Sequence, residues 1–332
     1  MDTTAPPVTT RVHAGTGVIE LDRPAALNAL DLTMVRLMTE ALQEWRDDRA
    51  VRSVLIRSTS PKAFCAGGDI RAMRDAGVRG DDATVLAYFS AEYALNLLIA
   101  RYPKPYTALI DGYAMGGGLG VSVHGSARVV TERAILAMPE TGIGFFPDIG
   151  ASHFLPRLAG AVGWYLGLTG LRIPGAAAVS CGLATHYVPA AELPALEAVL
   201  LAGAAPAQAL DRFAVAAPAS GADGHRAAIE RCFTAPDLAE LRARLARDED
   251  RAWADEALAA LESASPMSLA VTFDLLRAGA GSTLEECLAR ELDLARRVAH
   301  EPDFHEGVRA ALIDKDRAPA WSPYPPPAET WY

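Results

Sequence analysis

Three consecutive glycines, Gly116 to Gly118, constrain the fold of this 332-residue chain more than any other feature. They follow an apolar run at 106–110 that has the length of a buried β-strand, and they precede a predicted helix. Glycine loses more backbone entropy on folding than any other residue, so three in succession indicate that the backbone must approach something closely. The segment predicts a strand-to-helix turn that points backbone N–H groups at a ligand.

A second turn with paired glycines has the same setting. Residues 66–69, with the sequence AGGD, follow a predicted buried strand at 51–58 and precede a predicted helix. An ordinary strand-to-helix turn explains either segment alone, and neither fits the patterns G-x-G-x-x-G or G-x-x-x-x-G-K-[ST] of nucleotide loops. Together the two turns support the hypothesis of an oxyanion hole, in which N–H groups stabilise charge on a carbonyl oxygen.

Predicted strands and helices alternate along the first 190 residues. Residues 11–22 alternate in polarity around two glycines, which predicts a hairpin that ends at Arg23-Pro24. Asp31 is the expected N-cap of a first helix, and a second amphipathic helix is expected at 83–101. The apolar face of the first helix comprises Met34, Val35, Met38, Ala41, Leu42 and Trp45. This alternation predicts an α/β fold with a sheet and helical crossovers.

Beyond residue 188 the pattern changes to helical segments rich in Ala, Leu, Arg and Glu. The expected helices span residues 238–247, 251–262, 284–298 and 306–312. Residues 319–332 contain five prolines and two tryptophans, which predicts an extended tail on the surface. We therefore expect two regions: an α/β core at 1–190 that carries the ligand turns, and a helical C-terminal region at 191–332 with a Pro-rich tail.

Composition limits the expected partners and location. The 41 acidic and 31 basic residues give a net charge of −10, which disfavours nucleic acid and anionic lipid as partners. The four cysteines lie far apart and predict neither a disulfide framework nor a metal site. The first ten residues lack the features of an export signal, and no uninterrupted apolar stretch has the length of a membrane span. With only three lysines, a composition typical of a high-GC bacterium, we expect a bacterial cytoplasmic protein that does not bind membranes.

Two carboxylates stand eight residues apart in the loop at 138–150. Glu140 and Asp148 are surrounded there by apolar residues, glycine and proline. Burial raises the pKa of a carboxyl group, which suits a general base or a nucleophile. Two carboxylates that cap turns are an equally good explanation of such a loop in isolation.

The turns KAFCAGGDI (62–70) and DGYAMGGGLG (111–120) and the loop MPET (138–141), in this order and spacing, resemble the crotonase (enoyl-CoA hydratase/isomerase) superfamily. Further segments resemble its 3-hydroxyisobutyryl-CoA hydrolase branch: residues 92–96, 122–125, 137–150, 154–158, 303–310 and 313–316. The resemblance covers almost the whole chain, from Leu21 to Trp321. It implies a crotonase-like spiral of β-β-α units, with a C-terminal helical region that caps the acyl site and helps association into a homo-oligomer.

The resemblance also implies residue roles. The backbone N–H groups of Gly68 and Gly117 are expected to form the oxyanion hole around a thioester oxygen. Glu140 matches the second catalytic glutamate of hydratases, Asp148 matches an additional acid of the hydrolase branch, and Glu92 matches a helix carboxylate of that branch that faces the acyl pocket. Gly68, Gly117, Glu140 and Asp148 are thus the expected catalytic groups, and Glu92, Gly117, Glu140 and Asp148 the expected substrate contacts.

Gly120 occupies the position at which hydratases of this superfamily carry a first catalytic glutamate, so water addition by a glutamate pair is disfavoured. The resemblance implies instead hydrolysis of a short β-hydroxyacyl-CoA thioester, first of all 3-hydroxyisobutyryl-CoA, as in valine breakdown. Three alternatives stay open: an isomerase, a hydratase and a non-catalytic acyl-CoA-binding scaffold. The isomerase needs only one carboxylate.

Coenzyme A is part of such a substrate, so no separate cofactor and no metal are expected. The expected CoA-contacting residues are Ala26, Leu27, Lys62, Ala66, Gly68, Asp69 and Ile70. Lys62 and Arg23 flank the ligand turns, where a cation either meets the CoA phosphates or is an ordinary solvated charge. Cys65 has no evident basic partner and is expected to be a buried core thiol rather than a nucleophile.

Overall fold

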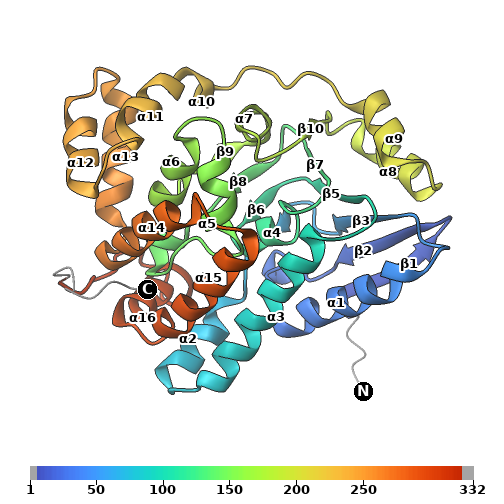
Figure 1. The fold of residues 1–332 in the computed structure, drawn as a ribbon, viewed down its shortest axis with the longest axis horizontal. Coiled ribbons are helices and arrows are strands. Elements are labelled where there is room, and N and C mark those ends of the chain that lie inside the picture. The colour runs from blue at the N-terminus through green and yellow to red at the C-terminus, as the bar shows by residue number, and fades with distance from the viewer. Residues whose placement is uncertain (1–5, 324–332) are drawn as a thin grey trace. The chain divides into compact units, whose positions relative to one another are not determined.

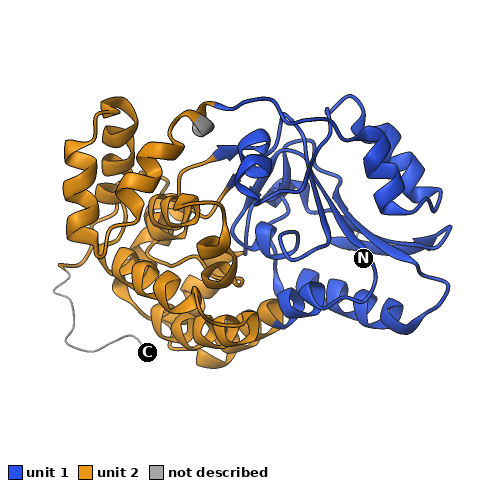
Figure 2. Cartoon of the chain, turned by 45° about the horizontal axis from the view of Figure 1, so that its top comes forward, with its two compact units in different colours: residues 1–68, 94–136, 173–220 blue, residues 69–93, 137–172, 221–332 orange. Residues whose placement is uncertain are grey.

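The structure is a computed structural model that describes residues 6–323, except for the side chains at positions 222 and 223. Its contacts divide the chain into two compact units, which Figure 2 colours separately. Unit 1 comprises residues 1–68, 94–136 and 173–220, and unit 2 comprises residues 69–93, 137–172 and 221–332. Each unit is therefore assembled from three separate stretches of the chain.

Unit 1 contains a six-stranded sheet in the order β1-β2-β3-β5-β7-β10 (Figure 1). Its strands are β1 (Val8–His13), β2 (Thr16–Leu21), β3 (Ser53–Ser58), β5 (Tyr106–Ile110), β7 (Ala127–Val130) and β10 (His186–Tyr187). The predicted hairpin is confirmed, because β1 and β2 pair antiparallel, whereas the other neighbouring strands pair in parallel. β2 and β5 are buried along their whole length, which is typical of parallel sheets covered on both faces.

A second sheet, which belongs to unit 1 except for Ala137, carries the glycine turns. Its four strands, in order, are β4 (Ala63–Cys65), β6 (Tyr113–Met115), β8 (Ile135–Ala137) and β9 (Ile173–Pro174). Because β4 and β6 pair in parallel, they end at the same edge of the sheet, and each predicted ligand turn follows one of them. The single-turn helix α4 (Gly117–Gly120) comes after β6.

The helices of unit 1 pack on the six-stranded sheet. The first, α1 (Leu32–Asp47), begins at its predicted N-cap, because Asp31 accepts a hydrogen bond from Met34 N at 2.8 Å. All six apolar residues predicted for its buried face are buried. α8 (Leu193–Leu201) and α9 (Pro206–Phe213) share one hydrophobic cluster with the sheet residues Leu55 and Leu109. Unit 1 also contains the short helices η1 (Pro24–Ala26) and α7 (Gly175–Cys181).

Unit 2 is built mainly from helices. Its C-terminal stretch contains α10 (Gly221–Gly224), α11 (Arg226–Phe233), α12 (Leu238–Arg247), α13 (Arg251–Ser263), α14 (Pro266–Gly279), α15 (Leu284–Val298), α16 (Pro302–Val308) and η4 (Arg309–Ile313). Its other stretches contain α2 (Ile70–Val78), η2 (Glu140–Ile143), α5 (Ala151–Phe154), η3 (Leu155–Arg157) and α6 (Val162–Thr169). α12 and α15 have their predicted bounds, whereas the helix expected at 306–312 is divided between α16 and the π-helical η4.

The second predicted helix is α3 (Asp82–Ala100), which contributes residues to both units. Its buried side chains include two polar groups, Glu92 and Asn96, among apolar ones such as Phe89 and Ile99. Within the described residues, α3 is also the one helix whose length and composition alone would allow it to cross a membrane. The core helix of a soluble protein passes the same test, so this is weak evidence of a membrane span.

The predicted α/β fold with a C-terminal helical region is confirmed, but the contacts divide the chain elsewhere than at residue 190. The loop after Ala137 joins the C-terminal helices, because Thr141 O accepts a hydrogen bond from Ser265 N at 3.1 Å. A Cβ built on Gly144 would lie 2.1 Å from Asp303 O, so this loop and α16 are in close backbone contact. Such long-range contacts leave no mark in the linear order of predicted elements.

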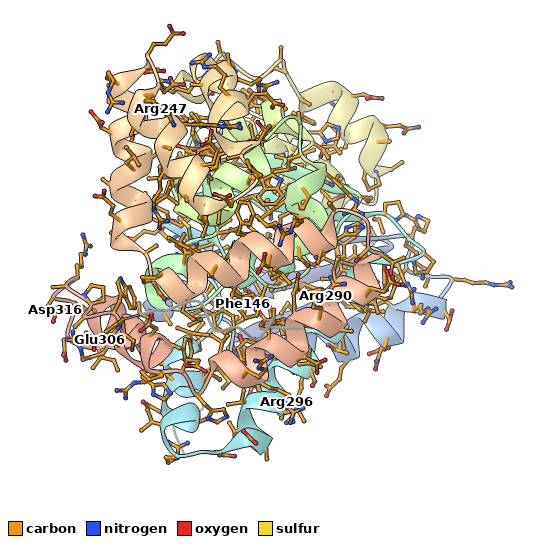
Figure 3. The ribbon with its side chains drawn as sticks, turned by 60° about the vertical axis from the view of Figure 1, so that its left-hand side comes forward. Phe146, Arg247, Arg290, Arg296, Glu306 and Asp316 are labelled. Atoms are coloured by element: carbon orange, nitrogen blue, oxygen red, sulfur yellow. The ribbon has the colours of Figure 1, made fainter. Side chains whose placement is uncertain are left out.

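The predicted tail is described only as far as residue 323, and residues 324–332 lie outside the described part. Trp321 Nε1 donates a hydrogen bond to Ser263 O at 3.0 Å, and Ser322 N donates one to Asp303 Oδ1 at 2.8 Å. Just before the tail, Asp316 and Glu306 lie close together (Figure 3), since both pair with Arg309. The described start of the tail therefore runs along the surface of unit 2 without helix or strand, as predicted.

Candidate functional site

The two glycine turns of unit 1 are in backbone contact. A Cβ built on Gly118 would lie 2.4 Å from the Cys65 carbonyl oxygen, and one built on Gly67 would lie 3.3 Å from the Met115 oxygen. Gly116 has a φ of 44° and a ψ of −118°, a backbone conformation that residues with a Cβ atom strongly disfavour. Glycine is therefore required for the turns to approach each other this closely.

The N–H groups of Gly68 and Gly117 donate no hydrogen bond within the described part of the chain. Gly117 is buried, and a buried backbone N–H without an acceptor is rare in proteins. The Cβ position built on Gly67 lies 3.9 Å from Gly117 N, so the two turns place their N–H groups in one neighbourhood. Two such donors can stabilise a carbonyl oxygen as it becomes negatively charged.

Asn28 holds the glycine turn at 66–69 in place, although sequence analysis did not single it out. Its Oδ1 accepts a hydrogen bond from Arg23 N at 2.7 Å, and its Nδ2 donates one to Phe64 O at 3.0 Å. Asn28 and Leu27 have positive φ values of 57° and 50°, which bend the chain toward the turn. Cys65 Sγ donates to Asn28 O at 3.0 Å, so the prediction of a buried thiol is confirmed.

The expected CoA-contacting residues are divided between the units. Ala26, Leu27, Lys62, Ala66 and Gly68 belong to unit 1, whereas Asp69 and Ile70 belong to unit 2. Ala66 N donates to Leu27 O at 3.0 Å, so segments 26–27 and 66–68 lie side by side. Lys62 is exposed, whereas Arg23 Nη1 donates to Ala29 O at 2.9 Å and is turned toward the protein.

Glu140 begins the 3-10 turn η2 in unit 2 and is only 7% exposed. Its Oε2 has no hydrogen-bond partner among the described residues. Burial raises the pKa of Glu140 well above its usual value, and the charges of Asp148 and Glu92 raise it further. A carboxyl group with an unpaired oxygen in such surroundings can take a proton from water or attack a carbonyl carbon.

Asp148 lies at the end of the loop that Glu140 begins. The Tyr93 hydroxyl donates a hydrogen bond to Asp148 Oδ2 at 2.7 Å. Burial raises the pKa of Asp148 to about 7, although the Tyr93 bond and a backbone hydrogen bond lower it in part. Asp148 can therefore give or take a proton near neutral pH.

Glu92 reaches the same region from α3. It is 2% exposed, it is hydrogen-bonded to Tyr88 one helical turn earlier, and its Oε1 has no partner in the described part of the chain. Burial raises the pKa of Glu92 well above its usual value, and the charge of Asp148 adds to this effect. Three carboxyl groups thus share one region of unit 2, and their mutual repulsion disfavours a state in which all are charged.

Aromatic rings make this region apolar. Phe145 stacks on Phe89 of α3 and on Phe146, with ring centroids 5.5 Å and 4.5 Å apart. Phe304 of α16 also packs against the Phe145 ring, with ring centroids 5.3 Å apart. The apolar surroundings predicted for the loop at 138–150 are therefore confirmed, and a C-terminal helix supplies part of them.

Sequence analysis missed another buried carboxyl group that interacts with Asp148, Glu291 on α15. It is 0% exposed and accepts hydrogen bonds from the backbone just after Asp148. Burial raises the pKa of Glu291 to about 8, although its hydrogen bonds lower it in part. A signal was present in the sequence, because Glu291 falls on the apolar face of its predicted helix, four residues after Cys287.

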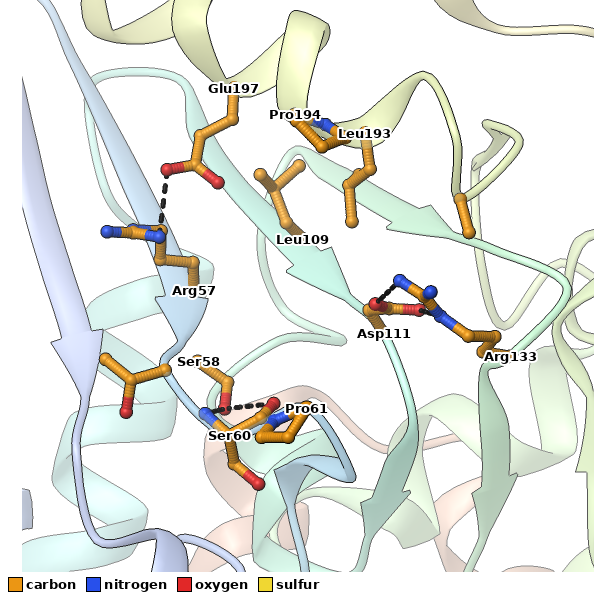
Figure 4. Close-up of a pocket in the computed structure, with 12 residues that line it drawn as sticks. Arg57, Ser58, Ser60, Pro61, Leu109, Asp111, Arg133, Leu193, Pro194 and Glu197 are labelled. Carbon is orange, nitrogen blue, oxygen red and sulfur yellow. Dashed lines mark hydrogen bonds and ion pairs between the residues drawn. The ribbon is translucent and has the colours of Figure 1, made fainter.

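A separate cavity of about 230 Å³ lies in unit 1 (Figure 4). Its two cations are already paired, Arg57 with Glu197 at 2.9 Å and Arg133 with Asp111. None of the expected CoA-contacting residues lines it. No group of three or more His, Cys, Asp or Glu side chains among the described residues is placed to hold a metal ion.

The structure thus brings the predicted site residues together in two sets. Gly68 and Gly117 are neighbours in unit 1, and Glu92, Glu140 and Asp148 are neighbours in unit 2. One set offers hydrogen-bond donors and the other offers proton acceptors, which are the two requirements of acyl-transfer chemistry.

Comparison with known proteins identifies the family. Residues 16–326 match the enoyl-CoA hydratase/isomerase family. This chain belongs to that family. It is 42% identical over 321 residues to the mitochondrial 3-hydroxyisobutyryl-CoA hydrolase of Gallus gallus, an alignment that covers 94% of this chain and 83% of the relative. The resemblance stated from the turns and the MPET loop is therefore confirmed.

Solved structures confirm the crotonase-like fold. A carnitinyl-CoA dehydratase from Mycobacterium thermoresistibile superposes with a TM-score of 0.90 at 37% identity, covering 96% of this chain and 92% of the other. An enoyl-CoA hydratase from Rhodobacter sphaeroides superposes with a TM-score of 0.88 at 42% identity, covering 95% and 92%. Because relatives of similar identity carry names of different reactions, family membership alone does not choose the reaction.

The predicted bacterial cytoplasmic location is contradicted by the curated relatives, which are mitochondrial enzymes of eukaryotes. The bacterial part of the prediction rested on scarce lysine, which reflects the base composition of a genome and not a compartment. The cytoplasmic part rested on the dispersed cysteines and on a start without the features of an export signal. The absence of membrane binding and the formation of a homo-oligomer stay predictions.

Proposed function

We propose that this chain hydrolyses the thioester of a short β-hydroxyacyl-CoA, first of all 3-hydroxyisobutyryl-CoA, to free coenzyme A and the hydroxy acid. The observation that carries the proposal is the group of buried carboxyls Glu92, Glu140 and Asp148, two of which have an oxygen without a partner among the described residues. Relatives at 42% and 44% identity that are named 3-hydroxyisobutyryl-CoA hydrolases support it.

Hydrolysis needs a nucleophile, a stabilised oxyanion and a proton for the leaving group. We assign the oxyanion to the N–H groups of Gly68 and Gly117. Glu140 acts on the thioester, either as the base that deprotonates water or as the nucleophile that attacks the carbonyl carbon. The C–S bond then breaks and the thiolate sulfur takes up a proton, which Asp148, with its pKa of about 7, is suited to give. If Glu140 is the nucleophile, water then cleaves the acyl anhydride formed on it, which releases the hydroxy acid and regenerates Glu140.

The other two carboxyl groups, Glu92 and Asp148, favour a substrate with a hydroxyl group at the β-carbon. Once Glu140 acts on the thioester, Glu92 and Asp148 lie in apolar surroundings, where an unpaired carboxylate is costly. A substrate hydroxyl can donate a hydrogen bond to either group. An acyl chain without the hydroxyl leaves that carboxyl unpaired, so we expect strong discrimination rather than the small effect of a missing methylene.

For the coenzyme A part of the substrate we propose contacts to segments 26–27 and 66–68 of unit 1, and to Lys62, Asp69 and Ile70. Lys62 is exposed and stays available for a phosphate, whereas Arg23 is hydrogen-bonded to Ala29 O. No cofactor besides the substrate's own coenzyme A enters this proposal.

The isomerase is the nearest alternative, because a single carboxylate at Glu140 is sufficient for proton transfer. A hydratase is less favoured, since Gly120 stands where the resemblance places a first glutamate. A non-catalytic acyl-CoA-binding scaffold is the alternative outside enzymes, and the cost of keeping several acids buried argues against it.

The test is the release of free thiol from a panel of acyl-CoA thioesters. We expect release from 3-hydroxyisobutyryl-CoA and 3-hydroxypropionyl-CoA, with a kcat/KM roughly 10⁴-fold higher than for isobutyryl-CoA, as for other sites built to bind a substrate hydroxyl. Equal kcat/KM for isobutyryl-CoA would indicate a general thioesterase. Hydration or isomerisation of an enoyl-CoA without thiol release would favour the first two alternatives, and binding without turnover the scaffold.

A further inference from the structure

Glu291 lies on α15, the helix that carries Arg290 and Arg296, which are labelled in Figure 3. Its side chain reaches the backbone at the end of the loop 138–150 and at the start of α5. Its Oε2 accepts a hydrogen bond from Gly150 N at 2.6 Å. Its Oε1 accepts hydrogen bonds from Ser152 N at 3.0 Å and from Ser152 Oγ at 2.5 Å. A fully buried carboxyl group held by three donors is fixed in position, and it fixes its donors in turn.

The turn that these hydrogen bonds hold is strained. Ile149 has a φ of 58°, in the left-handed region that a β-branched residue rarely adopts, and Gly150 follows with a φ of 83°. Ile149 comes directly after Asp148 in the chain. Conformations of this kind persist where the surrounding structure over-determines them, and they are frequent at functional sites. The backbone that aims Asp148 therefore depends on contacts from outside the turn.

We propose that Glu291 is a positioning residue, which clamps the Ile149–Gly150 turn and thereby aims Asp148 at the substrate. The inference rests on the proposed function for the role of Asp148. Glu291 acts mainly through the backbone, because two of its three hydrogen-bond donors are the Gly150 and Ser152 N–H groups and the third is the Ser152 hydroxyl. A carboxyl group is required, because both of its oxygens can accept hydrogen bonds, whereas an amide offers one oxygen and an NH2 donor.

Glu291→Gln is the closest change in shape, and it replaces one acceptor oxygen by an NH2 group that opposes an N–H donor. We expect kcat on 3-hydroxyisobutyryl-CoA to fall roughly 100-fold, because small displacements of a catalytic group have effects of this size. KM should change little, since Glu291 makes no contact with the coenzyme A residues named above. Ser152→Ala removes the hydroxyl donor but keeps both backbone hydrogen bonds, so a fall of roughly fivefold is expected.

Asp248→Asn is the matched control for a general loss of stability. Asp248 is also a buried acid of unit 2, and it accepts hydrogen bonds from Arg231 at 3.1 Å and from Asp250 N at 3.0 Å. This variant should lower Tm and leave kcat unchanged. In the double variant Asp148→Asn/Glu291→Gln, the second substitution should add little to the first, because its effect passes through Asp148.

Hydrogen exchange at the Gly150 and Ser152 amides tests the clamp without any turnover. We expect faster exchange in Glu291→Gln than in the wild type and in Asp248→Asn. Unchanged exchange, an unchanged kcat, or additive losses in the double variant would each overturn the proposal. Thiol release by the wild type is measured first. Its absence would overturn the proposed function, while the exchange result would still decide whether Glu291 holds the turn.

Discussion

The glycine turns of unit 1 and the carboxyl cluster of unit 2 carry opposite kinds of chemistry. The turns offer backbone N–H groups, which every residue except proline has and which do not titrate. The cluster offers side-chain carboxyls whose pKa values depend on burial and on one another. One part of the candidate chemistry is therefore set by local backbone geometry, whereas the other is set by what the fold buries.

Glu140→Gln is the strongest test of the carboxyl side of this comparison. It keeps the shape of the side chain and removes the base or nucleophile, so we expect thiol release to fall roughly 10⁴-fold. Binding of the CoA ester, measured by calorimetry, should be largely intact. Glu240→Gln, at a half-exposed position on α12, is the control and should retain full activity. Near-normal turnover of Glu140→Gln would refute the assignment, and a trapped acyl anhydride on Glu140 would identify it as the nucleophile.

Gly117→Pro tests the backbone side, because proline removes the N–H. Gly117 is the first residue of α4, a position that proline tolerates in helices. The loss of one oxyanion donor is expected to lower kcat roughly 10²–10³-fold. Gly117→Ala keeps the N–H at the same helical position and should lose much less. If both variants fold and lose activity equally, the side chain and not the donor is responsible, and the assigned role is wrong.

Tyr93→Phe changes the pKa of Asp148 without removing a carboxyl group. The Tyr93 hydrogen bond lowers the pKa of Asp148, which burial otherwise raises. Its loss should therefore shift the limb of the pH–activity profile that belongs to Asp148 to higher pH. Tyr165→Phe, at a buried tyrosine of unit 2 whose ring packs against Phe233 and Trp253, should leave the profile unchanged. A profile of Tyr93→Phe that matches the wild type would show that Asp148 does not control that limb.

Local patterns predicted the fold well where local contacts decide it. The hairpin, α1 with its Asp31 cap, and the bounds of α12 and α15 follow from polarity, capping residues and helical periodicity. The division into units does not follow from them. It depends on contacts such as that between Gly144 and Asp303, which are far apart in the sequence.

The same distinction applies to the candidate site. Consecutive glycines revealed the turns, because a backbone requirement is written directly in the residue type. The carboxyls Glu140, Asp148 and Glu92 were assigned roles by resemblance to a family. Glu291 was missed, since its partner Gly150 lies 141 residues away and no local pattern records such a contact. Asn28 was missed because it acts through hydrogen bonds to the backbone of Arg23 and of Phe64, the second of which lies 36 residues away.

Asp148→Asn has the smallest expected effect that still separates the two regions, a change of stability with pH. The pKa of Asp148 is raised from 3.8 to about 7 by burial, so between about pH 4 and pH 7 the folded chain binds a proton that the unfolded chain has lost. Wild-type stability that comes from this proton is fully present below pH 4 and is lost as pH rises through 7. Asparagine does not titrate, and its Oδ1 can still accept the Tyr93 hydrogen bond.

The gain in Tm of this variant over the wild type should therefore be larger at pH 8 than at pH 5, by roughly 2–4 °C for each kcal/mol. Glu92 and Glu140 enlarge this gain in Tm at pH 8. The charge of Asp148 raises their pKa values in part, and the Asn variant removes that charge. Gly117→Pro removes a group that does not titrate, so its Tm difference should be the same at both pH values. Thermal unfolding of both variants at pH 5 and pH 8 checks this. A pH-independent difference for Asp148→Asn would mean that Asp148 is charged in the fold at both pH values, because only a carboxyl that gains a proton on burial makes the folded state less stable as pH rises.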